Sequence, residues 1–113
     1  MRSVAELAVR QVYPLYVTKV ERKGHTKEEL DQVIRWLTGY TQSEVERLVA
    51  SEITFQEFFD KANLHPNAPL ITGTICGVKI QEIEDPLMKK VRYLDKLVDE
   101  VANGRKMEKI LRT

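Results

Sequence analysis

Few residues in this chain have the types that do chemistry. Cys76 is the only cysteine, and His25 and His65 are the only histidines. A nucleophilic cysteine needs a nearby base that favours its thiolate, and either histidine could be that base if the fold brought it close. Cys76, however, follows Ile75 in a segment typical of a strand, where a free cysteine usually packs as a small apolar residue. We therefore assign it no catalytic role.

A second candidate is the acidic cluster of Glu82, Glu84 and Asp85. Such carboxylates can bind a divalent cation or act as a general acid–base pair, but they also stabilise the positive N-terminal end of a helix. We keep a small ligand-binding protein or enzyme around His65, Cys76 and Glu82 as the third functional hypothesis. We assign no catalytic residue, metal ligand or cofactor from the sequence. The absence of a recognisable catalytic motif favours a protein that is not an enzyme.

Helix starts are marked by a repeated pattern in which Ser or Thr is followed three residues later by Glu. In this capping box the hydroxyl and the carboxylate each accept a backbone N–H that has no partner within the helix. Each box precedes apolar residues at helical spacing, which predicts helices at 4–12, 27–38, 42–50 and from 54 onward. Pro14 predicts a kink or a new helix that ends at Gly24. The boxes are Ser3/Glu6, Thr26/Glu29, Thr41/Glu44 and Thr54/Glu57.

The second half begins with a loop at 63–70, which is rich in proline and asparagine. The β-branched residues that follow predict a strand or hairpin turning near Cys76-Gly77. Asp85 and Pro86 then start a helix that reaches about Ala102, and one or two helical turns follow near Met107. The fold class is mainly α, a bundle of five to six mostly short helices with a short β strand or hairpin at about residues 70–83 (α+β).

Length and composition indicate one domain spanning 1–113. The chain has 113 residues, of which 42% are hydrophobic and 31% charged. This suits a single modest core, and no apolar run approaches the roughly 20 residues that cross a bilayer. A lone cysteine excludes an internal disulfide and a thiolate zinc cluster. We expect a cytoplasmic protein that does not enter a membrane.

The last long helix carries an apolar seam with spacings of four, three, four and three residues. Such spacing is typical of a coiled-coil contact. It leads to the first functional hypothesis, a non-enzymatic interaction module that self-associates through its C-terminal helix, as a homodimer. The predicted interface residues are Leu87, Val91, Leu94, Val98 and Val101.

Charge is unevenly distributed, although the net charge is only +1. Residues 1–24 carry +3, residues 25–60 carry −5 and residues 86–113 carry +4. A nucleic-acid-binding regulator is therefore the second hypothesis, either through these basic ends or through a helix–turn–helix formed by 27–38 and 42–50. The start of the second of these helices carries more acids than bases, which disfavours it as a recognition helix. The candidate contacts are Lys89, Lys90, Arg92, Arg105, Lys106 and Lys109.

Several motifs taken together resemble a family of small bacterial proteins known only as a domain of unknown function, number twenty-two hundred in that series. The resemblance covers about residues 12–112 and leaves out residues 1–11. It implies a bacterial, single-domain protein and brings no activity, cofactor or catalytic residue. The motifs are Val12–Val17, Glu21–Gly24, Trp36–Tyr40, Cys76–Val78, Glu82–Met88, Arg92–Glu100 and Met107–Leu111.

Overall fold

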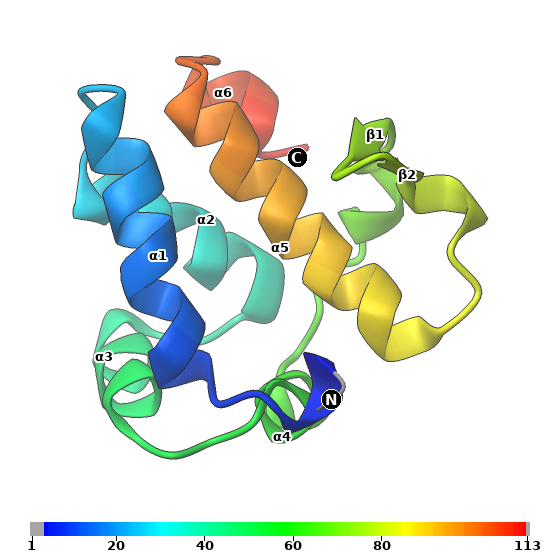
Figure 1. Ribbon diagram of the computed structural model, residues 1–113. Helices are drawn as coiled ribbons and strands as arrows, with labels where there is room; N and C mark the ends of the chain where they lie inside the picture. The colour runs from blue at the N-terminus through cyan, green and yellow to red at the C-terminus, as the bar shows by residue number, and fades with distance from the viewer. Residues whose placement is uncertain (1–3, 113) are drawn as a thin grey trace.

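The computed structural model describes residues 4–112 and is mainly α-helical with one short hairpin (Figure 1). The predicted fold class is confirmed. Three 3-10 turns connect the other elements, at Val4–Glu6, Ala68–Leu70 and Ile80–Glu82. The helices and strands are α1 (Val9–Arg22), α2 (Lys27–Thr38), α3 (Gln42–Ala50), α4 (Phe55–Lys61), β1 (Thr74–Ile75), β2 (Val78–Lys79), α5 (Pro86–Ala102) and α6 (Met107–Ile110).

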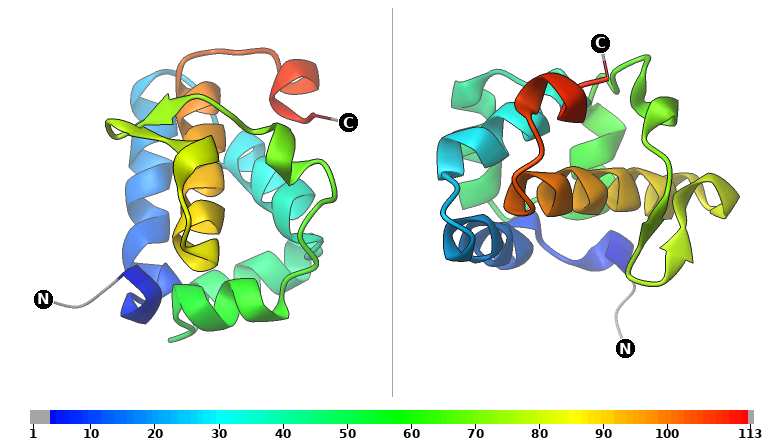
Figure 2. Two further views of the ribbon diagram at one scale, coloured as in Figure 1. Left: turned by 90° about the vertical axis from the view of Figure 1, so that its right-hand side faces the viewer. Right: turned by 90° about the horizontal axis from the view of Figure 1, so that it is seen from above.

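Helix α5 is the centre of the fold and packs against α1, α2, α4, α6 and β1. It runs beside α1 in the same direction, so the C-terminal ends of both helices lie at one end of the molecule (Figures 1 and 2). Helices α3 and α4 close the opposite end. The largest fully buried side chains include Leu30, Leu37, Phe55, Phe58, Leu94 and Leu97. No helix within residues 4–112 is long and apolar enough to cross a membrane.

Three of the four predicted capping boxes form as expected. The N–H of Glu29 donates to the hydroxyl of Thr26 at 3.2 Å, and the N–H of Thr26 donates to the Glu29 carboxylate at 3.0 Å. The same reciprocal pairs open α3, at Thr41 and Glu44, and α4. Because a box satisfies two N–H groups locally, it fixes a helix start without tertiary help. The fourth box, at Ser3, lies outside the described residues.

The predicted helix at 4–12 is wrong in its first half. Val4–Glu6 is a 3-10 turn, and α1 begins only at Val9. The backbone between them pairs with the loop before α4, since the N–H of Val9 donates to the carbonyl of Ile53 at 2.9 Å and the N–H of Phe55 donates to the carbonyl of Leu7 at 3.0 Å. This bridge satisfies in tertiary structure the groups that a helix would satisfy locally.

Pro14 does not start a new helix, because α1 continues through it from Val9 to Arg22. The proline lacks the N–H that would donate to the carbonyl of Arg10, so one intrahelical hydrogen bond is lost near the helix start. Pro14 itself is exposed. The helix ends with Gly24 in the left-handed region (φ +82), as the sequence predicted.

The hairpin turns at Cys76-Gly77, as predicted, with Ile75 opposite Val78. Both turn residues have positive φ, +52 for Cys76 and +77 for Gly77, which is typical of the tight turn that best matches strand twist. The expectation that Cys76 packs as an apolar strand residue is wrong, because the turn exposes its side chain. A residue in the turn does not follow the alternation of the strands that flank it.

Candidate ligand-binding groove

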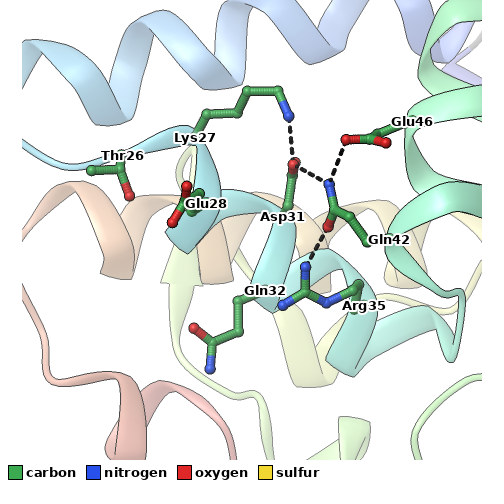
Figure 3. Close-up of a pocket in the computed structure, with 8 residues that line it drawn as sticks. All are labelled: Thr26, Lys27, Glu28, Asp31, Gln32, Arg35, Gln42 and Glu46. Carbon is green, nitrogen blue, oxygen red and sulfur yellow. Dashed lines mark hydrogen bonds and ion pairs between the residues drawn. The ribbon is translucent and has the colours of Figure 1, made fainter.

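A polar groove of about 740 Å³ opens between α2 and α3 (Figure 3). Every side chain that lines it is polar or charged. Pockets for drug-sized ligands are of similar volume but mostly apolar, so this groove suits a more polar molecule. Its lining residues are Thr26, Lys27, Glu28, Asp31, Gln32, Arg35, Gln42 and Glu46.

Asp31 lies at the centre of this groove and is almost fully buried, with 2% of its side chain exposed. Three side chains donate hydrogen bonds to its carboxylate. The hydroxyl of Tyr13 donates to Oδ1 at 2.5 Å, and Lys27 Nζ and Gln42 Nε2 donate to Oδ2 at 2.6 and 2.9 Å. A buried carboxylate is stable only when it is paired and hydrogen-bonded, and these donors meet that condition.

The helix starts position these donors. Lys27 is the first residue of α2, directly after the Thr26 cap, and lies one turn before Asp31. Gln42 is the first residue of α3, which follows α2 after a short turn through Gly39 (φ +75). Tyr13 reaches the same carboxylate from α1. Three helices therefore meet on Asp31.

The network holds its charges fixed at neutral pH. Burial raises the pKa of the Asp31 carboxyl, but the hydrogen bonds from Lys27, Tyr13 and Gln42 together lower it below its ordinary value. Burial and the hydrogen bond to Asp31 raise the pKa of Tyr13 to about 12. The hydrogen bond to Asp31 raises the pKa of Lys27 above its ordinary value. All three shifts move the pKa of the group further from 7.

Arg35 presents a cation to the groove from the last turn of α2. Its Nη1 donates to Oε1 of Gln42, whose Nε2 in turn donates to Asp31 and to Glu46 (Figure 3). A guanidinium has five N–H donors, and this contact uses one. Within residues 4–112 no carboxylate forms a salt bridge with Arg35. Glu28 and Glu46 contribute negative charge to the same groove.

The residues of the third hypothesis are not assembled into a site. The His65 ring stacks on Trp36 of α2, with ring centroids 4.2 Å apart. Glu82 forms an exposed ion pair with Lys79 at 3.8 Å, and Cys76 is exposed at the hairpin turn. In the described part of the chain no hydrogen bond or ion pair joins any two of His65, Cys76 and Glu82, and no cluster of three His, Cys, Asp or Glu side chains could hold a metal.

The apolar seam of α5 faces the core of its own chain. Its exposed fractions are 4% for Val91, 2% for Leu94 and 1% for both Val98 and Val101, while Leu87 is half-buried. Four of the five predicted interface residues are therefore part of the buried core of this chain, and α1 and α2 pack against their helix. The sequence alone could not distinguish a core face from an interface, since both require the same apolar spacing.

The six predicted nucleic-acid contacts do not form one surface. Lys89 and Lys90 lie in the first turn of α5, whereas Arg105, Lys106 and Lys109 lie beyond its other end. A helix of 17 residues is about 25 Å long, so the two groups are far apart. The remaining residue, Arg92, pairs with Asp95 at 2.9 Å.

Sequence reasoning missed the groove because its central residue looks like an ordinary surface acid. One signal was present, since Lys27 and Asp31 are one turn apart and Asp31 adjoins the buried Leu30. A charged residue at the border of an apolar helix face, with an opposite charge one turn away, indicates a paired buried ion. Tyr13 and Gln42 could not be found in this way, because their contacts depend on how three helices pack.

The fold is that of a small, mainly helical domain with a polar groove between α2 and α3. The chain belongs to a family described as an uncharacterized protein conserved in bacteria (DUF2200), whose sequence model matches residues 3–112. The family resemblance is confirmed, and it extends nine residues further toward the N-terminus than the motifs indicated. The structure is similar to the crystal structure of the uncharacterized protein SP1917, with a TM-score of 0.90 and 43% sequence identity over 96% of this chain and 89% of that one. No curated protein matches the chain.

Proposed function

We propose that this protein is a non-enzymatic binding module whose groove between α2 and α3 takes a small zwitterionic ligand, of the size of an amino acid or dipeptide. The observation that carries the proposal is the Asp31 network, which holds Gln42 and through it the Arg35 guanidinium in one arrangement. Preorganised charge of this kind favours binding because less side-chain entropy is lost when the ligand arrives.

The pKa shifts argue for binding rather than acid–base catalysis. A general acid or base works best when its pKa lies near the operating pH. Here the pKa of Asp31 is lowered, that of Tyr13 is raised to about 12 and that of Lys27 is raised. Each of these shifts favours the protonation state that the group already has at pH 7, so the network serves as fixed charge.

The charges of the lining residues select the ligand class. Asp31 and Lys27 neutralise each other, which leaves the Arg35 cation and the Glu28 and Glu46 anions to meet the ligand. A guanidinium matches a carboxylate geometrically, and the acids suit an ammonium group. A ligand that carries both groups can pair with the guanidinium and with an acid of the groove.

Thermal unfolding with added glutamate, arginine, glycylglutamate or succinate tests this proposal. We expect at least one zwitterion to raise the unfolding temperature, since a ligand that binds only the folded state stabilises it. Arg35→Gln should abolish that rise. The matched control is Arg47→Gln, which removes an exposed arginine of α3 outside the groove lining. If no probe shifts the wild type, or if both variants respond as the wild type does, the proposal is wrong.

Two further expectations belong with this proposal. A homodimer was predicted from the α5 seam, and because the fold buries that seam we now propose a monomer. We also propose a cytoplasmic location, which the single exposed thiol of Cys76 suits, because the reducing cytosol keeps such thiols unpaired.

A further inference from the structure

The parallel arrangement of α1 and α5 brings two basic turns together at one end of the molecule. Gly24 follows the end of α1 and Gly104 follows the end of α5, both with positive φ. The His25 side chain of the first turn lies beside the second turn, because a Cβ placed on Gly104 would lie 3.5 Å from its Nε2. One turn below, Lys19 of α1 pairs with Asp99 of α5 at 3.1 Å.

Both turns have the same well-defined hydrogen bonds. The N–H of His25 donates to the carbonyl of Val20 at 3.0 Å, and the N–H of Arg105 donates to the carbonyl of Glu100 at 3.1 Å. In each case the glycine N–H makes the inner bond of the same motif. These are the two bonds of a Schellman C-cap, so the side chains around the turns are carried on rigid backbone.

The side chains at this end carry an excess of positive charge. Four exposed cations in residues 20–26 and 103–110 form no salt bridge within the described residues, and the exposed acids of these two segments are Glu21 and Glu108. The C-terminal ends of α1 and α5 contribute only about half a negative charge each. Together they do not cancel the positive charge that the four cations leave after the two acids are counted. The four cations are Arg22, Lys23, Lys106 and Lys109.

We propose that this end of the molecule, formed by Arg22, Lys23, Lys106 and Lys109, binds the phosphate backbone of a nucleic acid without reading its sequence. The fold thus joins the two basic segments that the sequence separates by about 80 residues. This surface shares no residue with the groove lining. Compared with the sequence-based hypothesis, it keeps Lys106 and Lys109, adds Arg22 and Lys23, and leaves out the other four residues.

The composition of the surface favours this partner over a membrane or an acidic protein. Of the large apolar side chains exposed in the structure, Leu70 and Val78 lie in other elements, and Leu15 lies about two helical turns before Arg22 in α1. Amphipathic helices that lie on membranes insert apolar side chains, and stable protein interfaces have apolar or aromatic anchors. Binding by charge alone is typical of contacts with nucleic-acid backbone.

Fluorescence anisotropy with a labelled DNA duplex and a labelled single-stranded RNA, each of about 20 nucleotides per strand, tests the proposal. Four phosphate contacts predict that the logarithm of affinity for the duplex falls with the logarithm of salt concentration with a slope of about −3.6. The double variant Lys23→Gln/Lys106→Gln should reduce the slope by about half and weaken binding more than tenfold at 50 mM salt. Lys89→Gln/Lys90→Gln, at the other end of α5, is the matched control and should bind as the wild type does.

Vesicles containing phosphatidylserine and a polyglutamate peptide serve as competing polyanions. Binding of nucleic acid with the expected salt slope, lost in the Lys23/Lys106 variant alone, supports the proposal. It is overturned if neither nucleic acid binds at 50 mM salt, if the two double variants bind equally, or if only the vesicles or the peptide bind. Circular dichroism of both variants should match the wild type, since all four substituted lysines are at the surface or half-buried.

Discussion

Tyr13 and Asp31 are 18 residues apart in sequence, yet the tyrosine hydroxyl donates to the buried Asp31 carboxylate at 2.5 Å. The contact joins α1 to α2 and completes the set of donors around the carboxylate. Hydrogen bonds to charged groups contribute more than neutral ones, about 1.5–3 kcal/mol each. This one contact therefore bears on both the stability of the fold and the shape of the groove.

Removing the Tyr13 hydroxyl should destabilise the protein measurably. We expect Tyr13→Phe to lower the free energy of unfolding by about 1.5–3 kcal/mol, because a buried carboxylate loses a donor. Tyr93→Phe is the control, since Tyr93 is equally buried but its hydroxyl forms no hydrogen bond within the described residues, and it should cost under about 0.5 kcal/mol. Urea unfolding measures both, and equal losses would contradict the assigned role of the contact.

Stability should fall at acidic pH partly through Asp31. Its pKa is lowered in the folded state, so the unfolded state binds the proton more readily. The stabilisation is complete above the ordinary carboxyl pKa of about 4 and is lost as pH falls through the lower folded-state value. The Thr41 and Thr54 backbone and hydroxyl groups lower the pKa values of Glu44 and Glu57, which adds to the same trend.

Asp31→Asn isolates this contribution. We expect the variant to be less stable than the wild type at pH 7, because Lys27 loses its partner. The two curves of unfolding free energy against pH should converge as pH falls below about 4, since a protonated Asp31 is neutral like asparagine. Parallel curves between pH 7 and pH 2 would show that Asp31 is not the titrating group.

Gly39 ends α2 in the turn that leads to α3. Its φ is +75, and an added Cβ would lie 3.0 Å from the carbonyl oxygen of Asn63. Gly39→Ala should therefore cost about 2–3 kcal/mol through strain and close contact combined. Gly24→Ala has a similar φ of +82 with nothing within 4 Å, so strain alone should cost it about 1 kcal/mol. Equal costs in thermal unfolding would refute the contact with Asn63.

Local sequence predicted the helices wherever local bonds determine them. The boxes at Thr26, Thr41 and Thr54 satisfy their own backbone donors, so α2, α3 and α4 begin where the pattern places them. The failure at residues 4–8 has the opposite cause, because Leu7 and Val9 bond to residues near position 54. No pattern within the segment encodes that pairing.

The candidate sites were harder to predict because charge and apolar spacing do not specify a neighbour. Lys106 and Arg22 lie at one end only because α1 and α5 run parallel. The sequence of neither helix encodes that parallel packing. The same holds for the groove, where Gln42 meets Asp31 across a turn of fixed geometry. Site prediction here required the packing of whole helices.

The hairpin turn makes a distinct prediction for Cys76. Its thiol is exposed, so it should react with a thiol reagent in the native protein at the rate seen after denaturation. Its φ of +52 is unfavourable for cysteine, whereas asparagine tolerates that region and Asn-Gly is the preferred pair in this turn. Cys76→Asn should therefore leave the unfolding temperature unchanged or raise it. A lower value would mean that the thiol makes a stabilising contact.

Burial of the α5 seam predicts how its variants should behave in solution. Val98 is 1% exposed, so Val98→Ala should cost about 2 kcal/mol in unfolding free energy through lost burial and a small cavity. Leu15→Ala, at a side chain that is 66% exposed, should cost under about 0.5 kcal/mol. Light scattering should give the mass of one chain, about 13.1 kDa, for the wild type and both variants at low and high salt. A dimeric wild type that Val98→Ala dissociates without lowering stability would show that the seam is an interface. A core valine would instead lower the free energy of unfolding, whatever its effect on the mass in solution.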